Sequence, residues 1–117
     1  TIVPSRQHRV TRGDEYRSIV RKGRRVGGAF CITHAVLRSP EEPARFGYIV
    51  TKAVGNAVTR NLVRRRLKGI TEALLHDGLT GVDVVFRVLP ASSDAPYARM
   101  ADEVGRAVTR VLAERNQ

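Results

Sequence analysis

Residues 52–68 read KAVGNAVTRNLVRRRLK, and this stretch organises the rest of the chain. Gly55 allows a sharp turn at the end of a strand, and the Asn56 side chain can accept hydrogen bonds from the free N–H groups of a helix that starts there. We expect this helix to run from Asn56 to about His76. Four apolar residues share one side of it, within roughly 60° around the helix axis. They are Val63, Leu67, Ile70 and Leu74. The stretch therefore predicts a strand, a turn and a helix with one buried side.

The side of this helix next to the apolar stripe is strongly basic. It carries Arg60, Asn61, Arg64, Arg65 and Lys68, with Arg66 on the other flank. Successive helical turns rise by about 5.4 Å, close to the spacing of phosphates along an RNA strand, so several phosphates can be bound at once. Like charges one turn apart repel by a few tenths of a kcal/mol. A purely structural helix would relieve that repulsion with interleaved Glu, yet residues 52–68 contain no acid. The pattern favours phosphate binding over its alternative, a solvated helix face.

The charge of the whole chain indicates the same class of partner. The 117 residues carry a formal net charge of +10, and 42% of them are hydrophobic. That composition suits one folded domain over residues 1–117 and not a disordered basic tail. Residues 1–38 contribute +7 and residues 52–68 contribute +6, whereas the other segments are slightly acidic. We therefore expect a polyanionic partner.

Cellular location is indicated by what the sequence does not contain. No apolar run approaches the ~18 residues of a membrane helix, and no stretch has the pattern of a signal peptide. The single cysteine, Cys31, excludes an internal disulfide and a multi-cysteine zinc site, and it fits a reducing compartment. We expect a cytoplasmic protein with no membrane partner.

The remaining residues predict a helix at each end of the chain and further strands between them. Residues 1–12 read as an extended basic arm. Asp14 can cap a short helix that ends at Gly23, and Asp94 can cap a last helix. Strands are expected over residues 29–37, 46–51 and 82–89. The order αββαβα predicts a single-domain α/β sandwich, with helices packed on one mixed sheet.

Neither a metal site nor a protein active site is indicated by the polar residues. Cys31 and His34 stand three apart on a strand, so their side chains point to opposite faces. Asp102 and Glu103 are adjacent on a helix and face about 100° apart, so they form no acid–base pair. We expect Cys31 to be a small buried hydrophobic residue. The sequence thus favours a binding protein over a self-sufficient enzyme.

The stretch 52–68 closely resembles the signature of the bacterial ribonuclease P protein subunit, K-K-x-G-N-A-V-x-R-N-R-x-K-R-x-L-R. The resemblance continues beyond the signature, in Pro4 with Arg9-Val10, in the helix from Tyr16 to Gly23, and in the strand 81–85. Pro90-Ala91 and Tyr97 fit the start of the family's last helix. The residues that match the signature directly are Lys52, Gly55, Asn56, Ala57, Val58, Arg60, Asn61, Arg65 and Leu67, with basic exchanges at Arg64 and Lys68.

This resemblance implies an α+β fold with a mixed four-stranded sheet and an unusual left-handed β-α-β crossover. It implies that the chain assists an RNA-based endonuclease that removes the 5′ leader of precursor tRNA. The catalytic groups, and the Mg²⁺ that they require, then belong to the RNA subunit, and the protein binds no cofactor of its own. The implied partners are the catalytic RNA and precursor tRNA, with no DNA and no obligate protein partner.

The resemblance also implies two sets of binding residues. The catalytic RNA would contact Arg60, Asn61, Arg64, Arg65, Lys68 and Arg66. The leader would lie in a cleft between the first helix and the sheet, near Tyr16, Arg12, Arg17, Val20, Thr33, Lys52, Asn56 and Arg9. Core packing is the alternative for the first helix, and for Ile19 it is the interpretation that we prefer.

Four positions depart from the family pattern. Ala53 replaces a Lys and Leu62 replaces an Arg of the signature, with Arg66 as a substitute on that flank. Val20 and Thr33 stand where aromatic side chains are common in the family. Because base stacking contributes about 1–3 kcal/mol per base, leader binding should here depend on Tyr16 and on the charges of Arg12, Arg17 and Lys52.

Other classes of protein share some of these features. A ribosomal or ribosome-assembly RNA-binding protein would have the same charge and fold without a leader cleft. A DNA-binding domain would insert residues 57–68 into a major groove, but the second helix of a helix-turn-helix is missing. A membrane-surface helix is disfavoured because its apolar side is committed to the core.

Overall fold

Seven principal elements and one short 3₁₀ helix follow one another along residues 8–114, the part of the chain that the computed structural model describes. In chain order they are α1 (Gly13–Lys22), β1 (Arg24–Gly27), β2 (Cys31–Leu37), β3 (Arg45–Ile49), α2 (Ala57–His76), β4 (Val82–Val88), the 3₁₀ helix η2 (Pro90–Asp94) and α3 (Tyr97–Ala113). Within this range, no helix combines the length and the apolar character needed to cross a membrane.

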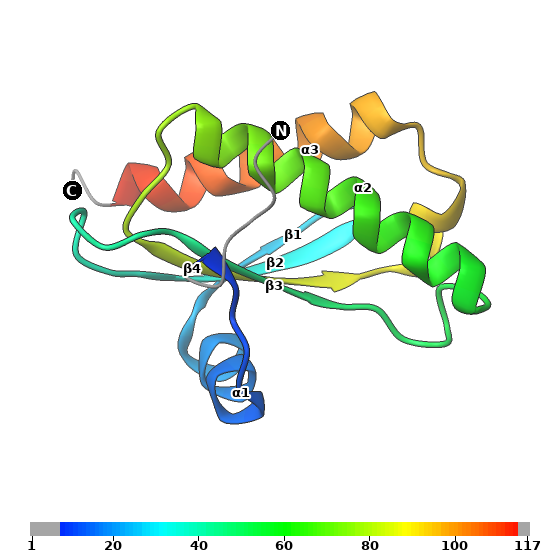
Figure 1. Ribbon diagram of the computed structural model, residues 1–117, viewed down its shortest axis with the longest axis horizontal. Coiled ribbons are helices and arrows are strands. Elements are labelled where there is room, and N and C mark those ends of the chain that lie inside the picture. Colours follow the sequence, from blue (N-terminus) through cyan, green and yellow to red (C-terminus); the bar gives the residue numbers. More distant parts are fainter. Residues whose placement is uncertain (1–7, 115–117) are drawn as a thin grey trace.

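One mixed sheet joins the four strands in the order β1-β2-β4-β3. β2 pairs antiparallel with both β1 and β4, whereas β3 pairs parallel with β4. Helix α1 covers one face of the sheet, and α2 and α3 cover the other (Figure 1). The prediction of helices packed on a mixed four-stranded sheet is confirmed.

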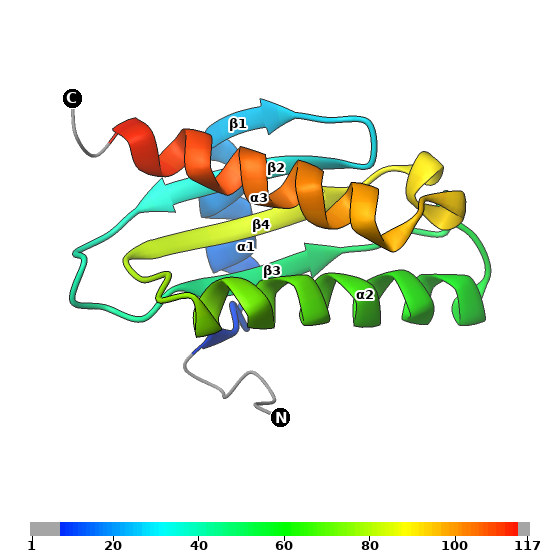
Figure 2. The same cartoon turned by 90° about the horizontal axis from the view of Figure 1, so that it is seen from above.

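The connection from β3 through α2 to β4 has the rare left-handed sense. In Figure 2 both strands run the same way, α2 lies on the viewer's side of the sheet, and β4 lies to the left of β3 for an observer looking along the strands. Strand twist makes about 98% of such parallel crossovers right-handed. The crossover hand that the family resemblance implied is therefore present.

The main core lies between the sheet and the pair α2 and α3. From β4, the side chains of Val82, Val84, Phe86 and Val88 alternate into it. The ring of Phe86 stacks with those of Phe46 and Tyr48, at centroid distances of 6.3 and 6.0 Å. The helices contribute the stripe Val63, Leu67 and Ile70 from α2 and Met100, Val104, Val108 and Val111 from α3. The apolar stripe that the sequence predicted on residues 56–76 is confirmed.

Helix α1 is held on the opposite face by a small apolar cluster and by ion pairs. Ile19 is buried against Val10 and Val85, as its core interpretation predicted. The carboxylate of Asp83 accepts hydrogen bonds from Arg45 (2.9 and 2.7 Å) and Arg38 (3.0 Å). Arg45 also donates to Glu15 of α1, at 2.8 Å. The Arg45–Glu15 pair thus connects α1 to the ion pairs at the ends of β3 and β4.

Two helix starts and one strand differ from the sequence predictions. α1 begins at Gly13 after Arg12, so Asp14 lies in the first turn, and α3 begins after Pro96, because Asp94 ends η2. β1 was not predicted, since its four residues include two arginines and end at Gly27. It forms because its backbone pairs with residues 32–35 of β2. Of the predicted basic arm, residues 1–7 lie outside the described range.

Candidate nucleic-acid interface

The start of α2 is fixed by the residues that the sequence singled out. The Asn56 side chain accepts a hydrogen bond from the Thr59 backbone N–H at 2.9 Å, which confirms the predicted cap. Gly55 has φ of +155°, and a Cβ there would lie 2.9 Å from Thr59 Cγ2. The tight turn lets α2 start directly after the β3 loop, in which Lys52 is exposed.

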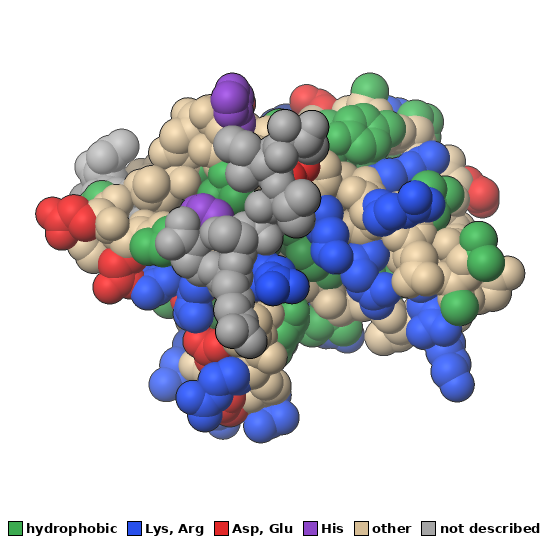
Figure 3. All heavy atoms as spheres, viewed as in Figure 1, with side chains coloured by type: hydrophobic (Ala, Val, Ile, Leu, Met, Phe, Trp, Pro, Cys, Tyr) green, Lys and Arg blue, Asp and Glu red, His purple; other side chains and the backbone are tan. Residues whose placement is uncertain are grey.

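Four of the predicted RNA-binding residues form one surface on α2. Asn61, Arg64, Arg65 and Lys68 line the same shallow groove, together with Val58. The Arg64 guanidinium donates to Asn61 Oδ1 at 3.0 Å, which holds it flat along the helix. Figure 3 shows basic side chains gathered over α2, with hydrophobic ones between them. We call these four residues the basic face.

Arg60 and Arg66 do not line the groove of the basic face. Arg60 is half-buried beside the apolar stripe, and its Nε is buried without a hydrogen-bond partner. Arg66 donates to the carbonyl oxygen of Ala95 at 3.0 Å and so joins α2 to the segment before α3. The structure thus gives Arg66 a structural partner, on the flank away from Arg64 and Lys68. This is the flank that the sequence predicted for Arg66, and its contact with RNA stays a prediction.

A second surface is the cleft between α1 and the sheet, with a volume of about 620 Å³. Tyr16, Val20 and Ile49 form its half-buried apolar lining. Three exposed arginines surround that lining, namely Arg17 and Arg21 from α1 and Arg87 from β4. An aromatic ring with cations around it suits a single-stranded nucleic acid, whose bases stack and whose phosphates are charged. Arg21, Ile49 and Arg87 were missed from the sequence because their positions depend on how α1 crosses the sheet.

Tyr16 is seated in the cleft by a glycine beneath it. A Cβ on Gly47 of β3 would lie 2.5 Å from Tyr16 Cε1 and 2.6 Å from Cζ, so only glycine leaves room for the ring. Gly47 pairs with Val85 on β4, which places it on the α1 side of the sheet. Tyr16 thereby keeps one side of its ring against the sheet backbone while remaining half-buried.

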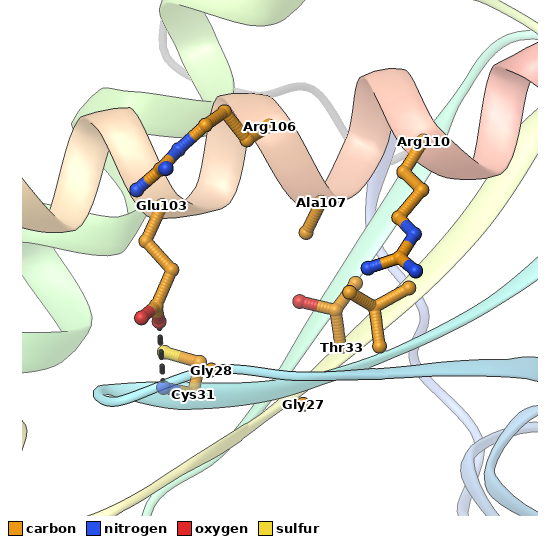
Figure 4. A pocket seen from close by; sticks show the side chains of 9 residues that line it. Gly27, Gly28, Cys31, Thr33, Glu103, Arg106, Ala107 and Arg110 are labelled. Carbon is orange, nitrogen blue, oxygen red and sulfur yellow. Dashed lines mark hydrogen bonds between the residues drawn. The ribbon is translucent and has the colours of Figure 1, made fainter.

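Thr33 does not line this cleft, contrary to the expectation. It lies on the other face of the sheet, 2% exposed beneath α3, in a pocket that also contains Cys31 and Ala107 (Figure 4). The neighbouring His34 is the residue that faces α1, since it pairs with Val85 in the register of β2 and β4. The placement of Thr33 was wrong by one residue, which in a strand means the opposite face.

His34 is a buried polar side chain that the sequence reasoning assigned no role. It is 4% exposed, and neither ring nitrogen has a hydrogen-bond partner. Burial, together with the positive charges of Arg87 and Arg25, lowers the pKa of His34. The ring is therefore neutral at neutral pH, and it adds an unused donor and acceptor to the α1 side of the sheet.

The pocket beneath α3 is built by an acidic clamp. The Glu103 carboxylate accepts hydrogen bonds from the backbone N–H groups of Ala29 (2.6 Å), Phe30 (3.1 Å) and Cys31 (3.0 Å). Figure 4 shows it reaching down from α3 to the hairpin of β1 and β2. A Cβ on Gly28 would meet this carboxylate at 2.5 Å. Burial, and secondarily the Glu103 charge, raises the pKa of Cys31 to about 12, so its thiol is un-ionised at neutral pH.

The other residues expected at the leader are exposed but do not line the cleft. Arg12 pairs with Asp14 at 3.2 Å, and Arg9 lies on the short bridge to Phe46. Lys52 and Asn56 lie in the loop between β3 and α2. Tyr16, Arg17 and Val20 are the three that the structure brings together. No three His, Cys, Asp or Glu side chains of residues 8–114 are grouped so that they could hold a metal ion.

Comparisons with known proteins give one consistent result. The model of the family described as Ribonuclease P matches residues 5–112. The chain is 45% identical over 108 residues to the ribonuclease P protein component of Clavibacter michiganensis subsp. michiganensis, covering 92% of this chain and 96% of that one. It is 37% identical over 112 residues to that of Nocardioides sp. (strain ATCC BAA-499 / JS614), covering 94% and 96%.

Solved structures show the same fold at lower sequence identity. The RNase P protein of Staphylococcus aureus superposes with a TM-score of 0.76 at 19% identity, covering 89% of this chain and 96% of that chain. The RNase P protein of Thermotoga maritima gives a TM-score of 0.77 at 16% identity, covering 88% and 96%.

Proposed function

Because the chain belongs to the ribonuclease P protein family, we propose that it binds the catalytic RNA through α2 and holds the precursor-tRNA leader in the cleft beside α1. As a member of this family, it is the protein component of a bacterial tRNA-processing endoribonuclease. Two surfaces of the protein would then bind two different RNAs.

The observation that carries the proposal is the presence of two surfaces of different chemistry on opposite sides of one sheet. The basic face lies on α2, whereas the cleft lies on the α1 side (Figure 1). The first offers three positive charges and one amide on successive helical turns, which suits a folded RNA backbone. The second offers an aromatic ring, aliphatic side chains and arginines, which suits an unpaired strand. One protein could thus bind both RNAs simultaneously.

We assign the catalytic groups and the Mg²⁺ to the RNA subunit. Support comes from two of the acidic side chains, whose contacts hold the fold together. Asp83 is paired with Arg38 and Arg45, and Glu103 is saturated by backbone N–H groups. The Cys31 thiol is buried, with a pKa raised to about 12, so it is no nucleophile at neutral pH. The chain's own residues would bind and orient RNA.

Leader cleavage tests the proposal directly. The protein is added to a bacterial ribonuclease P RNA with precursor tRNA at low Mg²⁺, and we expect cleavage to rise well above that of the RNA alone. A ribosomal RNA-binding protein would leave cleavage unchanged, and that outcome would overturn the proposal.

Two variants separate the two surfaces in the same assay. Arg65→Ala should weaken assembly with the catalytic RNA, and Tyr16→Ala should weaken binding of leader-bearing substrate only. Arg110→Ala is the matched control, because Arg110 is exposed on α3 away from both surfaces. If Tyr16→Ala reduced the affinity for leader-bearing and for leaderless RNA equally, the cleft would not be the site that holds the leader.

A further inference from the structure

The large hydrophobic side chains that residues 8–114 leave exposed lie on or beside α2, from its first turn to Gly69. They are Val58 (77% exposed), Tyr97 (47%) and Leu62 (36%). Val58 lines the groove of the basic face, and Leu62 lies one turn further along α2. Exposed apolar side chains that gather at one place are typical of an interaction surface. This gathering is unexplained by phosphate binding, which needs only charge.

Tyr97 reaches this surface from another helix. It is the first residue of α3, and a Cβ on Gly69 of α2 would lie 3.3 Å from its hydroxyl oxygen. Gly69 therefore lets the phenol lie close along α2. Arg65 lies one turn before Gly69 on the same side of α2, and Lys68 directly precedes Gly69 in the sequence. An exposed ring thus lies over Gly69, one helical turn from Arg65, at the point where the two helices meet.

The charge of residues 43–71 indicates the kind of partner. No acidic residue occurs between Glu42 and Glu72, so the stretch that surrounds Val58 and Leu62 has no negative charge. A protein partner would need an unusually acidic surface to match it, whereas every nucleotide offers a phosphate and a flat base together. Aromatic rings next to arginines are the usual stacking platforms for unpaired bases.

We propose that Tyr97 stacks on an unpaired base of the ribonuclease P RNA, with Arg65 and Lys68 on the adjoining phosphates and with Leu62 and Val58 continuing the apolar surface toward the start of α2. This inference rests on the proposed binding of that RNA by α2 and adds a contact with a base. It extends the RNA surface from one helix to two. It also gives Leu62, which replaces an arginine of the family signature, an apolar place in the contact.

Fluorescence provides a test, because the chain contains no tryptophan. Tyr97→Trp creates a unique fluorophore at the proposed stack, and we expect its emission to be quenched as full-length ribonuclease P RNA is titrated in. Thr109→Trp, at an exposed position later on α3, is the matched control and should change little. Saturable RNA binding without quenching at position 97 would overturn the proposal.

Two substitutions of Tyr97 separate stacking from a merely structural role. Tyr97→Leu keeps an apolar side chain over Gly69, so it should leave the melting temperature nearly unchanged yet weaken RNA affinity by roughly tenfold, as expected for one lost base stack. Tyr97→Phe should retain the affinity. Neither removes a charge, so the dependence of affinity on salt should stay the same. Wild-type affinity in Tyr97→Leu would refute the stack.

Arg65→Ala distinguishes failure of this inference from failure of the proposed function. If Arg65→Ala reduces the affinity and its salt dependence while Tyr97→Leu does nothing, α2 binds the RNA but Tyr97 does not. If neither substitution has an effect, the assignment of α2 itself is wrong. Self-association of the protein that Tyr97→Leu abolishes, seen by sedimentation without RNA, would show instead that the apolar surface binds a second copy.

Discussion

Substituting Gly47 by Ala places a methyl group directly beneath the ring of Tyr16. The new Cβ would lie 2.5 Å from Cε1, 2.6 Å from Cζ and 2.7 Å from Oη of that ring. Carbon atoms attract each other best at about 3.5–4.0 Å, so the ring must move by roughly 1 Å. Gly47 does not have a positive φ, so alanine is allowed by the backbone and the cost arises from space alone.

The expected loss of stability follows from two opposing contributions. Overpacking costs about 1–3 kcal/mol, while replacing glycine restricts the unfolded chain and returns about 0.4–1 kcal/mol. The net loss should be about 1–2 kcal/mol, which for a chain of this length lowers the melting temperature by about 4–8 °C. The displaced ring should no longer stack on a base, so the free energy of leader binding should weaken by ~1–3 kcal/mol, which is roughly 5- to 150-fold in affinity.

Thermal unfolding and substrate binding measure these two effects separately. Unfolding is followed by circular dichroism on the protein alone, and affinity is measured with the assembled holoenzyme on leader-bearing and leaderless tRNA. Gly105→Ala is the matched control, because nothing lies within 4 Å of its Cβ position in α3. It should raise stability by about 0.5–1 kcal/mol and leave leader affinity unchanged.

A double-mutant cycle with Tyr16→Ala decides whether the ring is the cause. Once the ring is removed, the added methyl has room, and Gly47→Ala should cost less than about 0.5 kcal/mol. An equal cost with and without the ring would refute the reasoning. So would a Gly47→Ala protein whose leader affinity is that of the wild type.

Three further predictions concern the basic face, the clamp of α3 and the buried histidine. Arg65→Ala should make the slope of log affinity for ribonuclease P RNA against log salt shallower by about one, and an unchanged slope would remove Arg65 from the phosphate contacts. Glu103→Gln should lower the melting temperature by about 8–12 °C, because weakening the charge-assisted hydrogen bonds to the β1–β2 hairpin costs about 2–3 kcal/mol. The control is Asp102→Asn, which removes only an exposed ion pair and should change the melting temperature by less than about 3 °C. Since the pKa of His34 is lowered on folding, the unfolded chain takes up that proton first, and the free energy of unfolding should fall as the pH drops below about 6.5. His34→Gln should flatten this fall between pH 7 and 5 in urea titrations, and an identical pH profile would show that His34 does not cause it.

The sequence by itself determined the features that depend on neighbours along the chain. The periodic placement of Val63, Leu67 and Ile70 determined the buried side of α2, and the Asn56 cap determined its start. The acid-free basic run determined the class of partner. Each of these follows from helix geometry and local charge, which need no tertiary contact.

Only the tertiary structure decided which residues from distant segments meet. Both faces of the sheet are covered by helices, so strand β2 is buried on both sides, and its alternation does not show which side meets α1. The family resemblance assigned Thr33 to the cleft, and the burial pattern of β2 could not show that His34 is the residue that faces α1. The seat of Tyr16 on Gly47 and the approach of Tyr97 to Gly69 likewise join residues about 30 apart in sequence. Those contacts depend on how the helices cross the sheet and each other, which is set by the packing of the whole core and by no local pattern.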